Sequence, residues 1–367
     1  MKMQRTPYRF LFAGGGTGGH LFPAVAVAEQ IRMMVPEAEI LFIGTRSKIE
    51  GRVVPKLGFK FKSIWIKGFS RKINFENLLF PLKLAVSIIQ SVLINIKFRP
   101  KVAIGSGGYV SGPAIFGSSL TGAKIILLEQ NSYPGITTRL LEKFASEIHI
   151  SFEDSKKYFR NFDKLFLTGN PIRSNLALTE RDNALKEFGL SPLHKTLLIT
   201  GGSLGARSIN EAVAESIKKF EEKGIQVIWQ TGKDYFDQNK NLASDFIKVM
   251  PFIDKMNFAY SACNLLLARA GATTISELLA LGIPSILVPS PNVAENHQYY
   301  NAKSLEKNNA AILLEDKRMK TELADEITGI IFNEDKLNQL RQNALSLAKP
   351  GAAGVIAKNA IKYAQAV

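Results

Sequence analysis

Residues 8–20, YRFLFAGGGTGGH, place a short apolar run directly before a glycine-rich loop. A strand buried on both faces of a parallel sheet reads as a continuous apolar run, and a glycine-rich turn after such a strand leads into a helix in doubly wound folds. The same order returns in the second half, where Thr196–Thr200 precedes Gly201-Gly202-Ser203-Leu204-Gly205. The chain therefore contains two similar strand–loop–helix starts, one in each half.

Further short apolar runs alternate with helix-length amphipathic segments. They are Glu39–Ile43, Lys101–Ile104, Lys124–Leu128, Gln226–Gln230, Asn264–Ala268 and Pro284–Pro289. This alternation is typical of parallel sheets with crossover helices. The sequence therefore predicts the α/β class, with two Rossmann-like, doubly wound parallel-sheet domains in series and a cleft between them.

The expected boundary between the domains is the turn-favouring run Gly169-Asn170-Pro171. We expect an N-terminal domain over 1–170, a C-terminal domain over 171–345 and a helical segment over 346–367. The last helix, 352–366, could pack on either domain, including back onto the N-terminal one.

Charge is unevenly divided along the 367 residues. The chain has 47 Lys and Arg against 32 Asp and Glu, a formal net charge of +15, and residues 1–173 carry +14 of it. Nucleic acid, an anionic membrane surface and a phosphorylated substrate are therefore candidate partners. Nucleic acid is disfavoured, because aromatic residues make up only 9% and do not alternate with basic ones. The single cysteine, Cys263, excludes an intrachain disulfide and a structural cysteine zinc site.

The segment Leu78–Phe98 is strongly apolar, with a narrow polar stripe along one helical face. A membrane-spanning helix is disfavoured, because the uncharged run Leu84–Ile96 is too short to cross a bilayer. Two alternatives stay open: a core helix of the first domain, or a helix whose exposed apolar edge enters a bilayer surface. Nine basic residues and one acid, Glu50, between Arg46 and Lys72 favour the membrane surface.

Glycine loops that open helices suit phosphate, because backbone N–H groups and the helix dipole both favour an anion. Nicotinamide dinucleotides are disfavoured, since the second strand ends Ile43-Gly44-Thr45-Arg46 without the acid that holds the ribose. A P-loop is excluded, because His20 and Leu21 follow Gly19 in place of Lys and Ser or Thr. His20, at the end of the first loop, is a candidate general base.

The second half offers a fuller nucleotide pocket in Gly201–Gly205 and Gly271–Glu277. Thr273 and Thr274 can donate to phosphate, and Glu277 can accept from a ribose diol. Simple capping is the alternative, because Thr274 and Glu277 have capping-box spacing.

Short motifs extend in order over nearly the whole chain. They are Gly15–His20 with Pro23, Gly107–Pro113, Glu129–Asn131, Gly169–Arg173, Gly201–Arg207, Phe252–Met256, Arg269–Glu277 and His297–Ala302. Together they resemble the MurG family, the bacterial N-acetylglucosaminyltransferases that convert lipid I to lipid II in peptidoglycan synthesis. The resemblance implies a GT-B architecture with UDP-N-acetylglucosamine (UDP-GlcNAc) in the C-terminal domain and lipid I mainly at the N-terminal one. It also implies inverting transfer without a metal or cofactor, on the cytoplasmic face of the cell membrane as a peripheral protein.

Carried onto matching positions, the resemblance makes His20 the catalytic base. Ile253 would hold uracil through its backbone, Arg173 would contact the uridine and Glu277 the ribose. The donor-binding set is Thr17, Gly18, Gly19, Asn131, Arg173, Ser203, Ile253, Ala272, Thr273, Thr274, Ile275, Ser276, Glu277 and Gln298. The acceptor-binding set is Gly16, Gly107, Gly108, Tyr109 and Glu129. A transferase with a diacylglycerol acceptor is the alternative, which the Ser106–Pro113 loop and Glu129–Asn131 disfavour.

Overall fold

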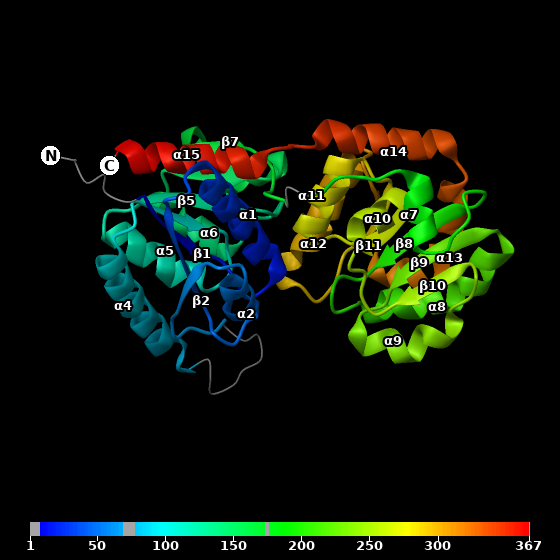
Figure 1. The fold of residues 1–367 in the computed structure, drawn as a ribbon, viewed down its shortest axis with the longest axis horizontal. Coiled ribbons are helices and arrows are strands. Elements are labelled where there is room, and N and C mark those ends of the chain that lie inside the picture. The colour runs from blue at the N-terminus through cyan, green and yellow to red at the C-terminus, as the bar shows by residue number, and fades with distance from the viewer. Residues whose placement is uncertain (1–7, 69–77, 173–175, 367) are drawn as a thin grey trace. The chain divides into compact units, whose positions relative to one another are not determined.

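The computed structural model describes residues 8–68, 78–172 and 176–366. The chain forms two compact units (Figure 1): Met1–Ser174 with Lys349–Val367, and Asn175–Ala348. Each unit is built around one parallel sheet with helices on both faces.

The first unit has a seven-stranded sheet in the order β3-β2-β1-β4-β5-β6-β7, in which each pair of neighbouring strands is parallel. The strands of this sheet are β1 (Arg9–Ala13), β2 (Glu39–Gly44), β3 (Lys60–Ser63), β4 (Val102–Gly105), β5 (Lys124–Glu129), β6 (Glu147–Ile150) and β7 (Leu165–Leu167). Its helices are α1 (Gly18–Met34), α2 (Ile49–Lys56), α4 (Phe80–Phe98), α5 (Ser111–Leu120), α6 (Ile136–Leu141) and α15 (Ala352–Ala366), with 3-10 turns η1 (Glu142–Phe144), η2 (Glu153–Tyr158) and η3 (Phe162–Lys164).

Alternate residues of β1 point to opposite faces of this sheet, as strand geometry requires. Phe10 and Phe12 pack with α1 and with Ile356 of α15, while Leu11 packs with Ile115 of α5 on the other face. The C-terminal helix α15 lies along α1 and so belongs to the first unit, although residues 175–348 separate it in sequence.

The second unit has a six-stranded parallel sheet in the order β10-β9-β8-β11-β12-β13. Its strands are β8 (Lys195–Thr200), β9 (Ile225–Gln230), β10 (Ile247–Met250), β11 (Leu265–Arg269), β12 (Ser285–Val288) and β13 (Ile312–Leu313). Its helices are α7 (Arg181–Glu187), α8 (Arg207–Glu222), α9 (Lys233–Asn239), α10 (Met256–Ala262), α11 (Ala272–Leu281), α12 (His297–Lys307), α13 (Met319–Ile331) and α14 (Glu334–Leu347), with 3-10 turns η4 (Lys240–Leu242), η5 (Ala294–Asn296) and η6 (Asp316–Arg318).

Strand order reverses at β1 in the first sheet and at β8 in the second. A glycine loop follows each of these strands, which is where doubly wound folds bind ligands. The predicted fold class, two doubly wound parallel-sheet domains, is confirmed.

Helix α4 buries polar side chains and exposes several apolar ones, which is the reverse of an ordinary amphipathic helix. Its buried residues are the polar Ser87, Ser91 and Asn95, and the Ser118 hydroxyl of α5 donates to Asn95 Oδ1 at 2.9 Å. Ile89 and Leu93 are 60% and 62% exposed. By length and composition α4 could cross a membrane, and only 17% of its apolar window is buried. The core-helix alternative holds for one side of α4, where Leu84 and Ile94 pack against the core of the unit, while Ile89 and Leu93 leave an apolar edge exposed.

Candidate functional site

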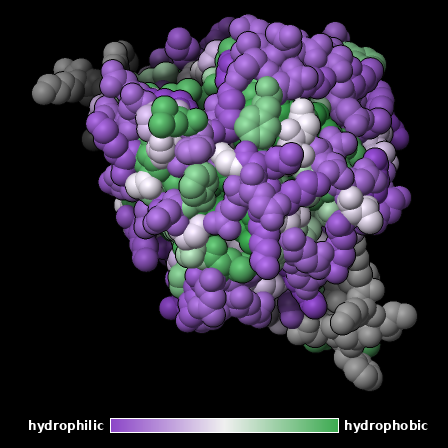
Figure 2. All heavy atoms as spheres, turned by 90° about the vertical axis from the view of Figure 1, so that its right-hand side faces the viewer, coloured by the Kyte–Doolittle hydropathy of each residue, from purple (hydrophilic) through white to green (hydrophobic). Residues whose placement is uncertain are grey.

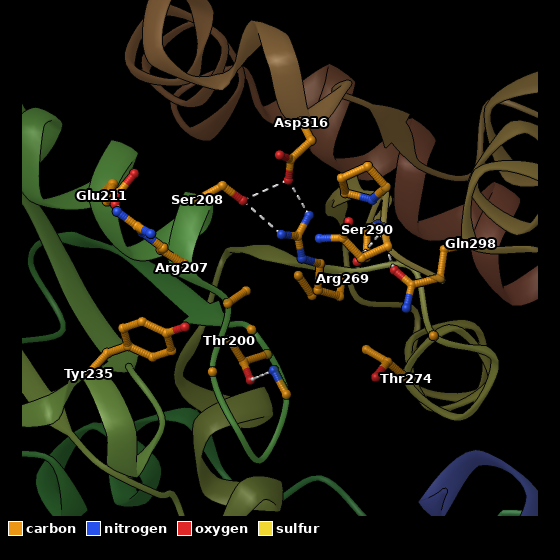
Figure 3. Close-up of a pocket in the computed structure, with 18 residues that line it drawn as sticks. Thr200, Arg207, Ser208, Glu211, Tyr235, Arg269, Thr274, Ser290, Gln298 and Asp316 are labelled. Atoms are coloured by element: carbon orange, nitrogen blue, oxygen red, sulfur yellow. Dashed lines mark hydrogen bonds and ion pairs between the residues drawn. The ribbon is translucent and has the colours of Figure 1, made fainter. Parts of the chain in front are cut away.

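A cavity of about 580 Å³ lies in the second unit, beyond the carboxyl ends of β8 and β11 (Figure 3). Its wall includes the glycine loop after β8, the first residue of α8 and the turn that opens α11. The residues that line it are Thr200, Gly201, Gly202, Gly205, Ala206, Arg207, Ser208, Glu211, Tyr235, Ala268, Arg269, Gly271, Thr274, Ser290, Pro291, Asn292, Gln298 and Asp316.

The glycine loop is compact because a neighbouring loop packs against its backbone. Gly205 has φ +80°, and a Cβ there would lie 2.0 Å from the carbonyl oxygen of Thr231. Only glycine fits this position. The loop thus brings the N-terminus of α8 to the cavity opposite that of α11, and two helix N-termini favour an anion.

Arg269 is held at the cavity wall by a network of its own (Figure 3). Its Nη1 donates to Asp316 Oδ1 at 2.5 Å and to Val288 O at 3.2 Å, and its Nη2 donates to Ser208 Oγ at 2.8 Å. The Ser208 hydroxyl also donates to Asp316 Oδ1 at 2.7 Å. The guanidinium is therefore fixed in place, so little side-chain entropy is lost when an anion binds.

Two predicted donor residues, Thr274 and Gln298, line this cavity. Ser290 N donates to Gln298 Oε1 at 2.8 Å, which fixes the direction of the side-chain amide. Neighbouring Thr273 has a buried hydroxyl with no hydrogen-bond partner among the residues that the structure describes. An unpaired buried hydroxyl is costly, and Thr273 is not among the residues that line the cavity.

The other predicted residues of α11 face the protein. Ile275 is fully buried, and Ser276 Oγ donates to Ala272 O at 2.8 Å, within the helix. Tyr260 OH donates to Glu277 Oε2 at 2.8 Å. The capping-box alternative is wrong, because α11 begins at Ala272 with Gly271 as its N-cap, so Thr274 lies inside the helix.

Two further donor predictions, Ser203 and Ile253, fall outside the cavity wall. Ser203 is exposed on the glycine loop. Ile253 is buried and its N–H donates to Gln230 Oε1 at 2.9 Å, so a uracil contact through its backbone would fall to its carbonyl oxygen. Arg173 lies outside the described residues.

In the first unit, His20 lies near the start of α1 and contacts a second loop. Its Nδ1 lies 3.0 Å from Ser106 O and 3.2 Å from Gln130 Oε1. Gln130 Nε2 donates to Leu128 O, which orients the amide so that its oxygen faces the imidazole. Both partners of Nδ1 are acceptors, so Nδ1 carries the proton and Nε2 is the basic nitrogen of the neutral ring.

The second loop depends on two glycines in the left-handed region. A Cβ on Gly107 would lie 2.7 Å from His20 Nδ1, and a Cβ on Gly108 would lie 2.5 Å from Gly15 O. Ser106 Oγ also donates to His20 O at 2.7 Å. The structure therefore brings the predicted residues Gly107 and Gly108 against the first glycine loop, where Thr17 is the N-cap of α1 and Gly18 and Gly19 begin it.

Glu129 and Asn131 form a buried turn after β5. Glu129 Oε1 accepts from Asn131 N at 3.0 Å and from Asn131 Nδ2 at 3.3 Å, and Oε2 accepts from Gly135 N at 3.1 Å. Burial raises the pKa of Glu129 to about 7, although these hydrogen bonds oppose the shift. The carboxyl group therefore holds the backbone of the turn that follows it, at Asn131 and Gly135.

Glu50 is a residue that the sequence reasoning missed. It is 1% exposed, and its carboxylate accepts from Gly16 N at 2.9 Å, Thr45 N at 3.0 Å and Thr45 Oγ1 at 2.5 Å. Thr45 Oγ1 in turn lies 3.2 Å from the hydroxyl of Tyr109, whose pKa is raised by burial. The available signal was its isolation as the one acid between Arg46 and Lys72.

Comparison with known proteins agrees with both halves of this description. Residues 10–150 match the glycosyltransferase family 28 N-terminal domain, and residues 196–356 match the glycosyltransferase family 28 C-terminal domain. The crystal structure of Acinetobacter baumannii MurG superposes with a TM-score of 0.79 at 25% identity, covering 97% of this chain and 100% of that one. The chain is therefore a glycosyltransferase with the GT-B fold.

Relatives with a named activity identify the family of glycosyltransferases more specifically. The UDP-N-acetylglucosamine–N-acetylmuramyl-(pentapeptide) pyrophosphoryl-undecaprenol N-acetylglucosamine transferases of Cytophaga hutchinsonii and Bacteroides thetaiotaomicron are 41% and 42% identical to it. The first match covers 95% of each chain and the second 98% of each. The chain belongs to this family of transferases, the MurG family.

Proposed function

We propose that this chain transfers N-acetylglucosamine from UDP-GlcNAc to the muramyl 4-hydroxyl of undecaprenyl-pyrophosphoryl-MurNAc-pentapeptide (lipid I), giving lipid II and UDP with inversion. The relatives named for this reaction match nearly the full chain at 41% and 42% identity. The observation that carries the donor half is the cavity with two helix N-termini and the fixed guanidinium of Arg269.

In this proposal the donor diphosphate lies between the N-termini of α8 and α11. Thr273, Thr274 and Ser203 donate to it, and the buried hydroxyl of Thr273 gains the partner that it lacks. Tyr260 orients the Glu277 carboxylate for the ribose hydroxyls. Ile253 accepts from the uracil through its carbonyl, Arg173 contacts the uridine, and Asn131 and Gln298 contact the sugar.

The transfer itself is an in-line displacement at the anomeric carbon. It needs a base for the acceptor hydroxyl and positive charge for the departing diphosphate. His20 Nε2 is the proposed base, with its tautomer set by Ser106 and Gln130. Helix N-termini and Arg269 supply the positive charge at the leaving group, so this mechanism uses no metal or cofactor. Gly16, Gly107, Gly108, Tyr109 and Glu129 form the acceptor side.

The first unit is also proposed to dock peripherally on the cytoplasmic face of the cell membrane. One face of the molecule is mostly hydrophilic, with hydrophobic residues in small separate groups (Figure 2). Helix α4 instead exposes Leu82, Ile89, Leu93 and Ile96. Near α6, a pocket of about 650 Å³ is lined by the basic side chains of Arg139, Lys143, Arg160 and Lys164. Apolar insertion together with positive charge on the same unit suits an anionic bilayer.

Replacing Ile89 and Leu93 together by Glu tests this docking. Both side chains are mostly exposed, so the variant should keep its melting temperature but lose sedimentation with anionic vesicles. Exposed Lys218 and Lys223 of the second unit, replaced by Glu, provide a control with the same number of new carboxylates. Equal vesicle binding by the α4 variant and the wild type would contradict the docking proposal.

The reaction is tested by incubating the purified chain with labelled UDP-GlcNAc and a lipid I analogue. The expected product carries a β-linked N-acetylglucosamine on the muramyl 4-hydroxyl, with one UDP released for each transfer. An α-linked product would contradict the inverting mechanism while leaving the substrates in place.

A further inference from the structure

The side chain of Glu50 occupies a space that two glycines leave for it. A Cβ on Gly15 would lie 2.4–2.7 Å from the carboxyl atoms of Glu50, and a Cβ on Gly44 would lie 2.5 Å from its Cγ. Neither glycine has a positive φ, so space and not backbone conformation requires glycine there. The ends of β1 and β2 are thus shaped around this one carboxylate.

The Glu50 carboxylate is stabilised by hydrogen bonds. Its two oxygens accept from Gly16 N, Thr45 N and Thr45 Oγ1, and within the described ranges no Lys, Arg or His forms an ion pair with it. Three donors aimed at one buried carboxyl group satisfy its oxygens in the interior. The same bonds hold the donors, so the loop after β1 and the loop after β2 are fixed to each other.

What Glu50 holds is the acceptor side of the proposed site. One oxygen fixes Gly16, which has φ +84°, and the ring of Tyr109 lies against Gly16, 3.2 Å from its ideal Cβ position. The other oxygen fixes Thr45, whose hydroxyl lies 3.2 Å from Tyr109 OH. The contacts through Gly16 and the contacts through Thr45 therefore both lead from Glu50 to Tyr109.

We propose that Glu50 is a positioning residue: it fixes the loop at Gly16 and, through Thr45, the side chain of Tyr109, so that the acceptor contacts are formed before lipid I binds. This inference rests on the proposed function. Because the N–H of Gly16 already donates to Glu50, the acceptor diphosphate in this proposal contacts other groups of the loop. Preformed contacts avoid the cost of ordering a flexible loop when the acceptor binds.

Kinetics of Glu50→Ala test the proposal in the full chain. We expect kcat/KM for a lipid I analogue to fall about 10–100-fold, because small displacements of binding groups have effects of this size. UDP-GlcNAc affinity by calorimetry should change much less, since the cavity proposed for the donor diphosphate lies in the second unit. The kcat/KM of Glu50→Gln should lie between those of the wild type and Glu50→Ala. The amide oxygen of Gln can accept from Gly16 or from Thr45 only, while its NH2 group faces a donor of the other residue.

A matched control is Glu142→Gln. Glu142 is also a buried carboxylate that accepts backbone N–H groups, from Arg160 at 2.6 Å and Asn161 at 3.0 Å, away from the acceptor loops. It should lower the melting temperature but leave the kinetics of the folded enzyme unchanged. An equal kinetic loss in both carboxylate variants would reduce Glu50 to a general stabilising role and overturn the proposal.

Gly15→Ala supplies a second, independent test. In the wild type the new methyl group collides with the Glu50 carboxylate, so acceptor kinetics should fall. In the Glu50→Ala background the collision is absent, and Gly15→Ala should have little further effect. Strictly additive losses would contradict the contact on which the proposal depends.

Amide hydrogen exchange separates this inference from the proposed function. Exchange at Gly16 and Thr45 should accelerate at least about 10-fold in Glu50→Ala and stay slow in Glu142→Gln. Loss of protection without any transfer to lipid I by the wild type would contradict the proposed function alone. Unchanged protection, or unchanged acceptor kinetics in a folded Glu50→Ala variant, would overturn the positioning role.

Discussion

The glycine loops after β1 and β8 follow equivalent strands, yet the charged side chains placed near them differ. In the first unit, the buried carboxylates of Glu50 and Glu129 hold the backbone of Gly16 and of Asn131. In the second unit, the guanidinium of Arg269 stands at the wall of an open cavity. The same backbone motif thus lies against a buried carboxylate in one unit and lines an open cavity in the other.

The buried groups do not follow the formal charge of each half of the sequence. The first half carries +14 of the formal charge, yet its glycine loops are supported by negative groups. The second half is nearly neutral, and the guanidinium at its cavity is paired with the carboxylate of Asp316. Formal charge therefore does not predict which charged groups lie beside each glycine loop.

The largest expected effect is at His20. Replacing it by Ala should lower kcat about 10²–10⁴-fold, the usual contribution of a general base. Donor affinity should persist, because His20 belongs to the first unit and the cavity to the second. Single-turnover transfer and calorimetry with UDP-GlcNAc measure the two quantities, and near-normal turnover would remove His20 from the base role.

The pH dependence of stability tests the buried acid Glu129. Burial raises the pKa of Glu129 from 4.5 to about 7, so between these values the folded chain keeps a proton that the unfolded chain has lost. Its stabilising contribution is full below about pH 4.5 and is lost as the pH rises through 7. Relative to Glu129→Gln, the wild type should lose up to about 3 kcal/mol over this window. Denaturant unfolding at several pH values measures it, and a constant difference between the two proteins would refute the shift.

Arg269 is the counterpart in the second unit. Its replacement by Met should weaken UDP-GlcNAc binding about 30-fold, because a charged hydrogen bond to the diphosphate is lost. Arg207→Met is the matched control: Arg207 also lines the cavity, but it is largely exposed and pairs with Glu211 at 2.7 Å. Calorimetry on folded variants should show a loss several-fold smaller for the control, and equal losses would argue against a special place for Arg269.

The smallest effect is expected at Glu277. Glu277→Ala should weaken donor binding about 10-fold by removing the acceptor for the ribose hydroxyls. Tyr260→Phe, which removes only the hydroxyl that orients this carboxylate, should weaken binding less. If UDP-GlcNAc binds Glu277→Ala as it binds the wild type, Glu277 has a structural role only.

Most of the fold could be predicted from the sequence. Apolar runs such as Tyr8–Ala13 and Thr196–Thr200 are continuous because parallel strands are buried on both faces, and the structure has strands at both places. Glycine loops after them mark the points where strand order reverses. Local pattern is sufficient for these features because each depends on neighbouring residues.

Other features depend on contacts between distant residues. The polar stripe of α4 faces α5 because Asn95 meets Ser118, a pairing that the helical period of α4 alone does not reveal. Thr274 and Glu277 have capping-box spacing, but α11 begins earlier and Tyr260 takes the carboxylate. Glu50 reads as one acid in a basic segment until the fold brings it beneath Gly16.

Competition between substrates tests the central claim most directly. The purified chain is given labelled UDP-GlcNAc or labelled UDP-glucose, together with a lipid I analogue and a diacylglycerol acceptor in one reaction. We predict a single labelled product, the lipid I analogue carrying N-acetylglucosamine. Label on the glycerolipid, or no label on the lipid I analogue, would contradict the account.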